Sequence, residues 1–256
     1  MPEAPLIVPP KNSSSSDHAR EYPVGWGDDD LTRFLITSEE NGYATYQRMP
    51  DEFKALSRVN DLFKEAVDAL HNSEKWFVGV MFIQAHSDYL GAVRLIISGQ
   101  IPEGFKALRG CLETVFYCFH IDKNAELLEV WLRRDESPES KQKVRDNFQI
   151  GAILRELESV APEHHPPAKK MYEELIDFGA HPNEKALSGR LKQEEGDGFF
   201  QFNVNYLNPN PLQLKYGMTT AVRIGLLTLK IFGCVIPERF SISGVRLKVD
   251  SMARSY

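Results

Sequence analysis

Residues 86–120 read HSDYLGAVRLIISGQIPEGFKALRGCLETVFYCFH, and this stretch decides the fold class. It holds the end of one apolar helix and most of the next. Gly99 predicts where the first helix stops, because glycine readily adopts the left-handed conformation that closes many helices. Pro102 and Glu103 predict the start of the second, since proline suits the first turn and an acidic side chain there faces the positive end of the helix dipole. The stretch therefore predicts two consecutive helices joined by a short turn.

Apolar residues repeat every three or four positions over most of the chain, and this period predicts further helices. The helix that stops at Gly99 begins near Glu74 and is apolar on most sides, so we expect it at the centre of a bundle. The other helices are predicted over residues 50–72, 102–120, 124–134, 137–157, 168–179 and 211–236. We therefore predict an all-α fold, an antiparallel bundle of five to six long helices.

Residues 198–206 break the helical period. Phe200, Phe202, Val204 and Tyr206 alternate with polar residues, which is typical of a β-strand. The bundle is therefore expected to carry a short β excursion near 198–206. A single strand needs a partner, and the N-terminal arm and a second subunit are both candidates.

The chain is predicted to have three parts. Residues 1–49, rich in Pro and Ser near the start, are expected to form a flexible N-terminal arm with one short helix over 31–37, capped by Asp30. Residues 50–236 form the helical bundle domain. Residues 237–256 form a basic C-terminal tail.

Composition excludes some classes of partner. The 256 residues carry a formal net charge of −6, so the basic footprint of a nucleic-acid-binding protein is absent. Trp76–Ile97 and Tyr216–Ile236 are apolar enough to suggest membrane spans, but both contain charged residues that cost about 2.5–3.5 kcal/mol each in a bilayer. We predict that both are core helices and that the protein binds neither membranes nor nucleic acid.

The cysteines and the N-terminus indicate the compartment. The first twenty residues lack the positive segment and apolar run of a secretory signal. Cys111, Cys118 and Cys234 lie in apolar helical segments without zinc-site spacing, and such sparse cysteines fit buried, inert thiols in a reducing cytosol. A cytoplasmic location is expected. The pair His164-His165, in a Pro-rich connector, is predicted to be a solvated turn.

A polar constellation lies on the helix that starts at Pro102. Arg109, Glu113 and His120 are four and seven residues apart, so they share one edge of its apolar stripe. An Arg–Glu pair in that position is expected to be at least half buried and then needs further hydrogen-bond partners. The candidate partners are His86, Asp88 and Tyr89 on the preceding helix, and Tyr172, Asp177 and His181 later in the chain.

Two interpretations of this constellation are open. It is either a structural network that ties three helices together, or a pocket in which Arg109 holds a small anion while His181 or Glu113 transfers protons. The candidate ligand-binding residues are Arg109, Glu113, His181, Tyr172 and His86. Glu113, His120 and His181 are a less favoured metal-ligand set. Since no metal-binding or nucleotide-loop motif occurs, we predict no metal and no cofactor.

The same residues carry a family resemblance. The stretch 86–120, followed by YEELIDFGAHPNE at residues 172–184, resembles a group of uncharacterised bacterial helical proteins that share an Arg-x-x-x-Glu helix and a late His. These proteins are distantly similar to the HEPN superfamily, which includes RNases and phage-defence or toxin proteins. The resemblance covers roughly residues 55–235 and implies a helical fold, with Arg109, Glu113, Tyr172 and His181 as its marked positions.

The chain departs from the HEPN RNases at their catalytic motif. Those enzymes use an Arg and a His that are separated by four to six residues on one helix. Here ten residues separate Arg109 from His120, and eight separate Arg155 from His164. The resemblance therefore implies fold more than activity.

The sequence leaves three candidate functions. The first is a non-catalytic binding or interaction module, linked through the resemblance to bacterial stress or phage defence. The second is a small-molecule or nucleotide-binding protein. The third is a hydrolase or nuclease that uses Arg109, Glu113 and His181, so whether the chain is an enzyme stays open. A helix as apolar as Trp76–Ile97 also leaves an apolar face, which favours a homodimer.

Overall fold

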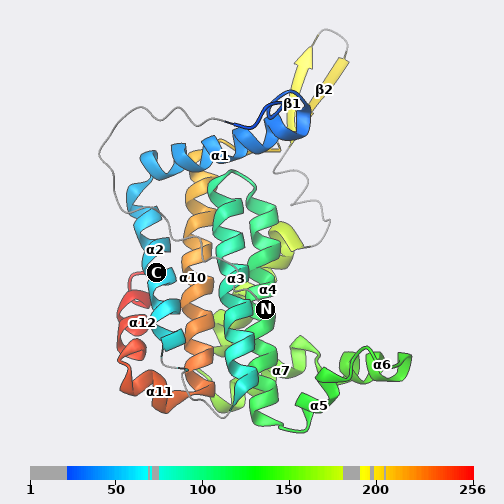
Figure 1. Ribbon diagram of the computed structural model, residues 1–256, viewed down its shortest axis with the longest axis vertical. Helices are drawn as coiled ribbons and strands as arrows, with labels where there is room; N and C mark the ends of the chain where they lie inside the picture. The colour runs from blue at the N-terminus through cyan, green and yellow to red at the C-terminus, as the bar shows by residue number, and fades with distance from the viewer. Residues whose placement is uncertain (1–21, 69, 71–74, 181–190, 197–198, 205) are drawn as a thin grey trace. The chain divides into compact units, whose positions relative to one another are not determined.

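The fold is all-α, as predicted. The computed structural model describes residues 22–68, 70, 75–180, 191–196, 199–204 and 206–256, with the side chains of 180 and 191–204 left out. Its helices, in chain order (Figure 1), are α1 Asp30–Arg48, α2 Pro50–Asp68, α3 Trp76–Ile97, α4 Ile101–Lys123, α5 Leu127–Leu132, α6 Pro138–Asn147, α7 Ile150–Val160, α8 His165–Leu175, the π-helical turn η1 Ile176–Ala180, α10 Pro211–Val235, α11 Pro237–Ile242 and α12 Val245–Ala253.

The chain divides into two compact units, Met1–Ile36 and Thr37–Tyr256. In the first, the side chain of Asp29 caps the start of α1, because its Oδ1 accepts a hydrogen bond from the Thr32 N–H at 2.9 Å. The Thr32 hydroxyl in turn accepts one from the Gly27 N–H at 3.0 Å. The cap is therefore Asp29 rather than the predicted Asp30.

The prediction of a flexible arm through residue 49 is wrong for its last part, because α1 runs on to Arg48 instead of ending near residue 37. A tertiary contact explains the difference. The side chain of Thr45 is buried, and its hydroxyl donates to the carbonyl of Ile97 at 2.7 Å. The second half of α1 is thus stabilised by the end of α3, which no local pattern in the arm reveals.

The core of the second unit forms around α10, which packs against α2, α3 and α4 (Figure 1). α3 and α4 make the most extensive contact and run antiparallel. Four fully buried aromatic side chains from three helices meet in this core: Phe63, Phe82, Tyr89 and Phe232. Burial of such large apolar side chains is the main stabilising contribution to the bundle.

The turn between α3 and α4 is confirmed. Gly99 has a φ of +91°, and its N–H donates to the carbonyl of Ile96 while the Gln100 N–H donates to that of Leu95 at 2.8 Å. This is the glycine-terminated helix end expected from the sequence. Pro102 lies in the first turn of α4, also as expected.

Elsewhere the predicted helices differ in extent. The helix expected over 50–72 ends at Asp68. The helix expected to follow Ser137 does begin there, since the Ser137 hydroxyl accepts from the Ser140 N–H at 3.1 Å, but it divides into α6 and α7 at Phe148. Phe148 is itself buried, so packing against the bundle outweighs continuation of the helix.

The predicted basic tail, residues 237–256, is mostly helical. α11 and α12 pack against the C-terminal part of α10, and the side chains of Val245 and Val249 are buried. Lys248 also forms an ion pair with Glu65 of α2, with 2.7 Å between Nζ and Oε2. The tail is thus part of the fold.

A β-hairpin lies between η1 and α10. β1 (Leu191–Gly196) pairs antiparallel with β2 (Phe199–Val204), and Leu191 stands opposite Val204 in the register. Within the described part of the chain, the partner of the expected strand is the segment just before it. The β1 sequence, LKQEEG, lacks the apolar alternation that would have revealed it.

Among the described helices, α10 alone has the length and apolar composition of a membrane span, and 72% of its most apolar window is buried inside the fold. That degree of burial is typical of a core helix in a soluble protein.

Candidate functional site

The structure brings together three of the five predicted site residues. Arg109 and Glu113 lie one turn apart on α4, and Tyr172 reaches them from α8. Arg109 donates from Nε to Glu113 Oε1 at 2.8 Å and from Nη2 to the Tyr172 hydroxyl oxygen at 3.1 Å. The Tyr172 hydroxyl donates to the same Glu113 oxygen at 2.8 Å. The three side chains form a closed ring of hydrogen bonds, here called the α4–α8 clamp.

Electrostatics hold the clamp in one protonation state. Burial raises the pKa of Tyr172 to about 12, and the hydrogen bond and charge of Glu113 add to the effect. Burial alone would lower the pKa of Arg109, but the hydrogen bond and charge of Glu113 outweigh it and raise that pKa. The side chains of Arg109 and Glu113 are only 24% and 33% exposed. A neutral phenol and a charged guanidinium that satisfy one carboxylate favour the structural interpretation.

The other two predicted residues do not join the clamp among the described contacts. His86 faces α2, where its Nε2 lies 2.8 Å from Asn60 Oδ1 and its ring stacks on Phe63 at 4.8 Å. Burial, with a smaller contribution from Lys64, lowers the pKa of His86, so its imidazole is neutral at pH 7. The prediction that His86 belongs to the site is wrong. His181 lies outside the described residues.

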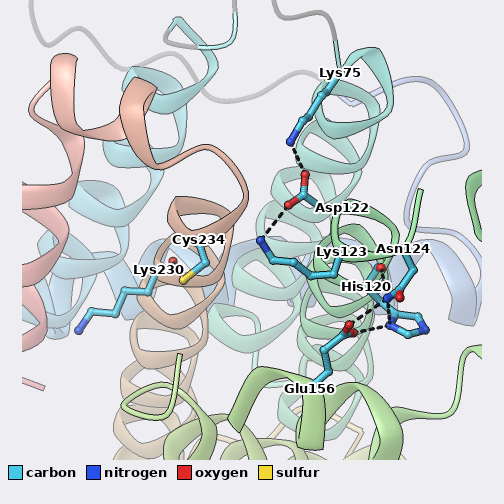
Figure 2. A network of polar contacts seen from close by, with 8 residues as sticks. All are labelled: Lys75, His120, Asp122, Lys123, Asn124, Glu156, Lys230 and Cys234. Carbon is cyan, nitrogen blue, oxygen red and sulfur yellow. Dashed lines mark hydrogen bonds and ion pairs between the residues drawn. The ribbon is translucent and has the colours of Figure 1, made fainter. Parts of the chain in front are cut away.

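His120 belongs to a different network, on the far part of α4 (Figure 2). Its Nδ1 lies 2.5 Å from Glu156 Oε2 on α7. Its Nε2 lies 3.1 Å from the carbonyl of Asn147. Asn124 donates to the other oxygen of Glu156 at 2.9 Å. His120 therefore connects α4 to α7 and shares no described contact with Glu113, although the two lie on the same edge of the helix.

A neighbouring ion cluster connects the start of α3 to the end of α4 (Figure 2). The buried carboxylate of Asp122 accepts from Lys75 Nζ at 2.5 Å and pairs with Lys123 Nζ at 3.2 Å. Two cations around one buried carboxylate satisfy the charge that burial would otherwise leave unpaired. This cluster is structural too.

Metal binding has no support within the described part of the chain, where no three His, Cys, Asp or Glu side chains gather closely enough to hold an ion.

A cavity of about 490 Å³ lies between the α7–α8 connection and helices α10, α11 and α12. Apolar side chains, including Leu229, Phe240 and Val249, line part of it. The charged groups at its wall are Glu163, Lys230, Arg246 and Asp250, and His164 and Cys234 are also exposed to it.

Sequence reasoning missed this cavity because its wall comes from two segments, residues 160–164 and 229–250, that are far apart in the chain. Two earlier predictions change as a result. His164 is part of a cavity wall, with a side chain only 15% exposed, rather than a solvated turn. Cys234 is half buried, whereas Cys111 and Cys118 are buried as expected.

Comparison of the chain with protein families, with curated proteins and with solved structures finds no match. The likeness to HEPN proteins therefore stays an expectation.

The clamp makes a prediction about alkaline pH. Replacing Tyr172 by Phe removes two hydrogen bonds at a half-buried site, and we expect it to lower the free energy of unfolding by about 1 kcal/mol at pH 7. Because the folded-state pKa of Tyr172 lies above the ordinary value of 10.0, its stabilising contribution is complete below pH 10 and is lost as pH rises toward 12. The wild-type protein should thus lose stability more steeply than Y172F above pH 10.

Urea unfolding at a series of pH values measures this difference. The exposed Tyr46 provides the matched control, and Tyr46→Phe should follow the wild-type curve. Parallel curves for wild type and Tyr172→Phe above pH 10 would contradict the role assigned to the phenol.

Proposed function

We propose that this protein is a non-catalytic binding module of the cytoplasm, whose ligand is a small molecule held in the cavity beside α10. The cavity itself carries the proposal. Its volume of about 490 Å³ lies within the range of small-molecule sites, and its wall combines an apolar surface with a few polar groups, as such sites do.

The charges around the cavity favour a zwitterionic ligand with an apolar body. Two cations, Lys230 and Arg246, face two carboxylates, Glu163 and Asp250, so the charged groups balance. Lys230 and Asp250 already form a pair, with 3.5 Å between Nζ and Oδ1. Burial lowers the pKa of His164, which leaves this imidazole neutral at pH 7. Arg109 does not line this cavity, so the small anion expected at Arg109 is not part of this proposal.

Arg246 and Glu163 are the groups best suited to hold the two ends of such a ligand. Arg246 has no carboxylate partner within ion-pair distance in the described part of the chain, so its guanidinium is able to bind a ligand carboxylate. Among the described residues, Glu163 pairs with His164 alone, at 3.7 Å, and so offers a carboxylate to an ammonium group. The ligand's apolar body would then lie against Val160 and Pro237, the exposed apolar residues of the cavity wall.

The cavity also contains a thiol and an imidazole, but they do not make a nucleophile. Burial raises the pKa of Cys234, and the nearby charge of Glu163 raises it further. An activated cysteine needs the opposite shift, since the thiolate is the reactive form. The proposal is therefore binding rather than catalysis.

The cytoplasm is proposed because all three cysteines are free thiols in the structure. Bacterial stress or phage defence is proposed as the biological setting on the family resemblance alone. RNase activity is not proposed, because the Arg–His spacing of the HEPN RNases does not occur.

Three probes with the same apolar body test the proposal: L-phenylalanine, 3-phenylpropionate and 2-phenylethylamine. Each is titrated by calorimetry, and each is tested for protection of Cys234 against iodoacetamide. Cys111 and Cys118 serve as internal references, because they are buried and burial raises the pKa of both thiols. We expect saturable protection of Cys234, strongest for the zwitterion.

A pair of variants assigns the binding to the cavity. Arg246→Ala should weaken the binding of the two probes that carry a carboxylate and leave the binding of 2-phenylethylamine little changed. Arg254→Ala, also on the C-terminal segment but outside the cavity wall, should have no effect. If none of the three probes protects Cys234, or if both variants behave alike, the proposed ligand class is wrong.

A further inference from the structure

One face of α3 is apolar and exposed along the whole helix. Trp76 and Val80 are each 53% exposed, Ile83 is 61% exposed and Leu90 is 46% exposed. The opposite face of α3 packs into the core. With Ser87 and Arg94, which are also exposed, these residues follow one another at intervals of four, three, four, three and four. This set is here called the α3 seam.

The spacing of the seam is that of a coiled coil. Alternating steps of four and three residues make up a heptad repeat, which keeps a line of side chains on one side of a helix when a second helix winds around it. The core face of α3 already has its partners in α2, α4 and α10. The seam is thus a second packing face, turned to solvent.

The seam is also symmetric about Ala85. When a second copy of α3 is laid antiparallel with a two-fold axis at that residue, Trp76 falls opposite Arg94, Val80 opposite Leu90 and Ile83 opposite Ser87. An antiparallel coiled coil pairs its positions in this way. In a two-fold interface, if residue i of one copy contacts residue j of the other, then residue j of the first copy contacts residue i of the second.

The chemistry of the paired positions agrees with this register. Arg94 is the single charged residue of the seam, and the register places its guanidinium at the indole of Trp76, a favourable cation–π partner. Arg94 has no ion pair in the described part of the chain that would hold it elsewhere. The other paired side chains are apolar or small, so no charge is buried without a partner.

Two glycines beside the seam permit close approach. Gly79 and Gly91 fall opposite each other in the same register, and a Cβ atom added at either would meet no atom of this chain within 4 Å. Without side chains at these positions, a facing helix can come near the α3 backbone. A residue of ordinary size there would hold the two helices apart.

From this symmetry we propose that two copies of the chain associate through antiparallel packing of α3 on α3, with the two-fold axis at Ala85. A second copy is favoured over another partner because the register brings Gly79 to Gly91 and Arg94 to Trp76, each a compatible pair. α3 has 22 residues and is about 33 Å long, so this seam is smaller than a standard protein interface. The dimer is therefore expected to be weak and to depend on concentration, with a Kd in the micromolar range.

Sedimentation velocity of the full chain over a concentration series tests the association. Ile83→Glu places a charge next to its own two-fold mate and should raise the Kd by roughly tenfold or more. Leu247→Glu is the matched control, since Leu247 is 76% exposed on α12, and it should leave the Kd unchanged. Circular dichroism checks that both variants stay folded.

Cysteine cross-linking tests the register independently. When chains with Val80→Cys are mixed with chains with Leu90→Cys, a disulfide should form between them under mild oxidation. Neither variant alone should cross-link, because two copies of residue 80 would stand about 15 Å apart along the antiparallel pair.

Three results would overturn the inference. The wild-type protein stays monomeric up to several hundred micromolar, Leu247→Glu weakens the dimer as much as Ile83→Glu, or Val80→Cys cross-links to itself as in a parallel pair. None of these results depends on the cavity, so the proposed function stands or fails separately.

Discussion

Replacement of Phe232 by Ala is expected to lower the free energy of unfolding by about 3–5 kcal/mol. Phe232 is fully buried on α10, and its ring lies 4.7 Å from that of Phe82 on α3. The substitution removes the transfer free energy of a whole aromatic side chain and leaves a cavity that the surrounding helices fill only in part. It should be among the most destabilising single changes in the chain, because α10 packs against three other long helices.

Chemical denaturation of the purified variant measures the effect. Leu212→Ala is the matched control on the same helix, since Leu212 is 78% exposed, and its effect should stay within about 0.5 kcal/mol. A loss below about 1 kcal/mol for Phe232→Ala would mean that α10 is not packed at the centre of the bundle as described.

Gly225→Leu is the second substitution with a large expected effect. A Cβ atom at Gly225 would lie 2.5 Å from Val59 Cγ1 and 2.9 Å from Tyr89 Cε2. Both neighbours are fully buried, so they have little room to move. The intrinsic helix preference of Leu over Gly is worth about 1 kcal/mol, and the steric conflict between α2, α3 and α10 should exceed it. We expect a net loss of about 3 kcal/mol, at the upper end of measured overpacking effects.

Gly151→Leu, the same change on α7, isolates this steric effect. Gly151 is exposed, and the nearest atom to an added Cβ there is Arg155 Nη1 at 3.9 Å. That variant should be neutral or slightly stabilised in thermal unfolding, while Gly225→Leu should unfold at a much lower temperature. Equal melting temperatures for the two variants would show that α2 and α10 are farther apart than the structure has them.

The α4–α8 clamp shows why a candidate site could be found and yet misassigned. Arg109 and Glu113 lie one turn apart, and that spacing alone predicts an ion pair. Tyr172 was among several candidate partners, and the structure shows that it closes the ring. The three side chains bond to one another, and none of them lines the cavity beside α10. The spacing along a helix identifies which side chains share one edge of that helix. It does not show whether those side chains form hydrogen bonds with one another.

The sequence by itself determined the all-α class, the turn at Gly99 and the pairing of Arg109 with Glu113, because each depends on residues within a few positions of one another. Only the tertiary structure decided that His86 faces α2, that α1 extends along the end of α3, and that residues 160–164 meet residues 229–250 around a cavity. The periodicity of a helix shows which of its faces is buried. It does not show which neighbouring helix covers that face. That choice is made by the packing of side chains from distant segments, which fixes both the neighbour and the space that is left between them.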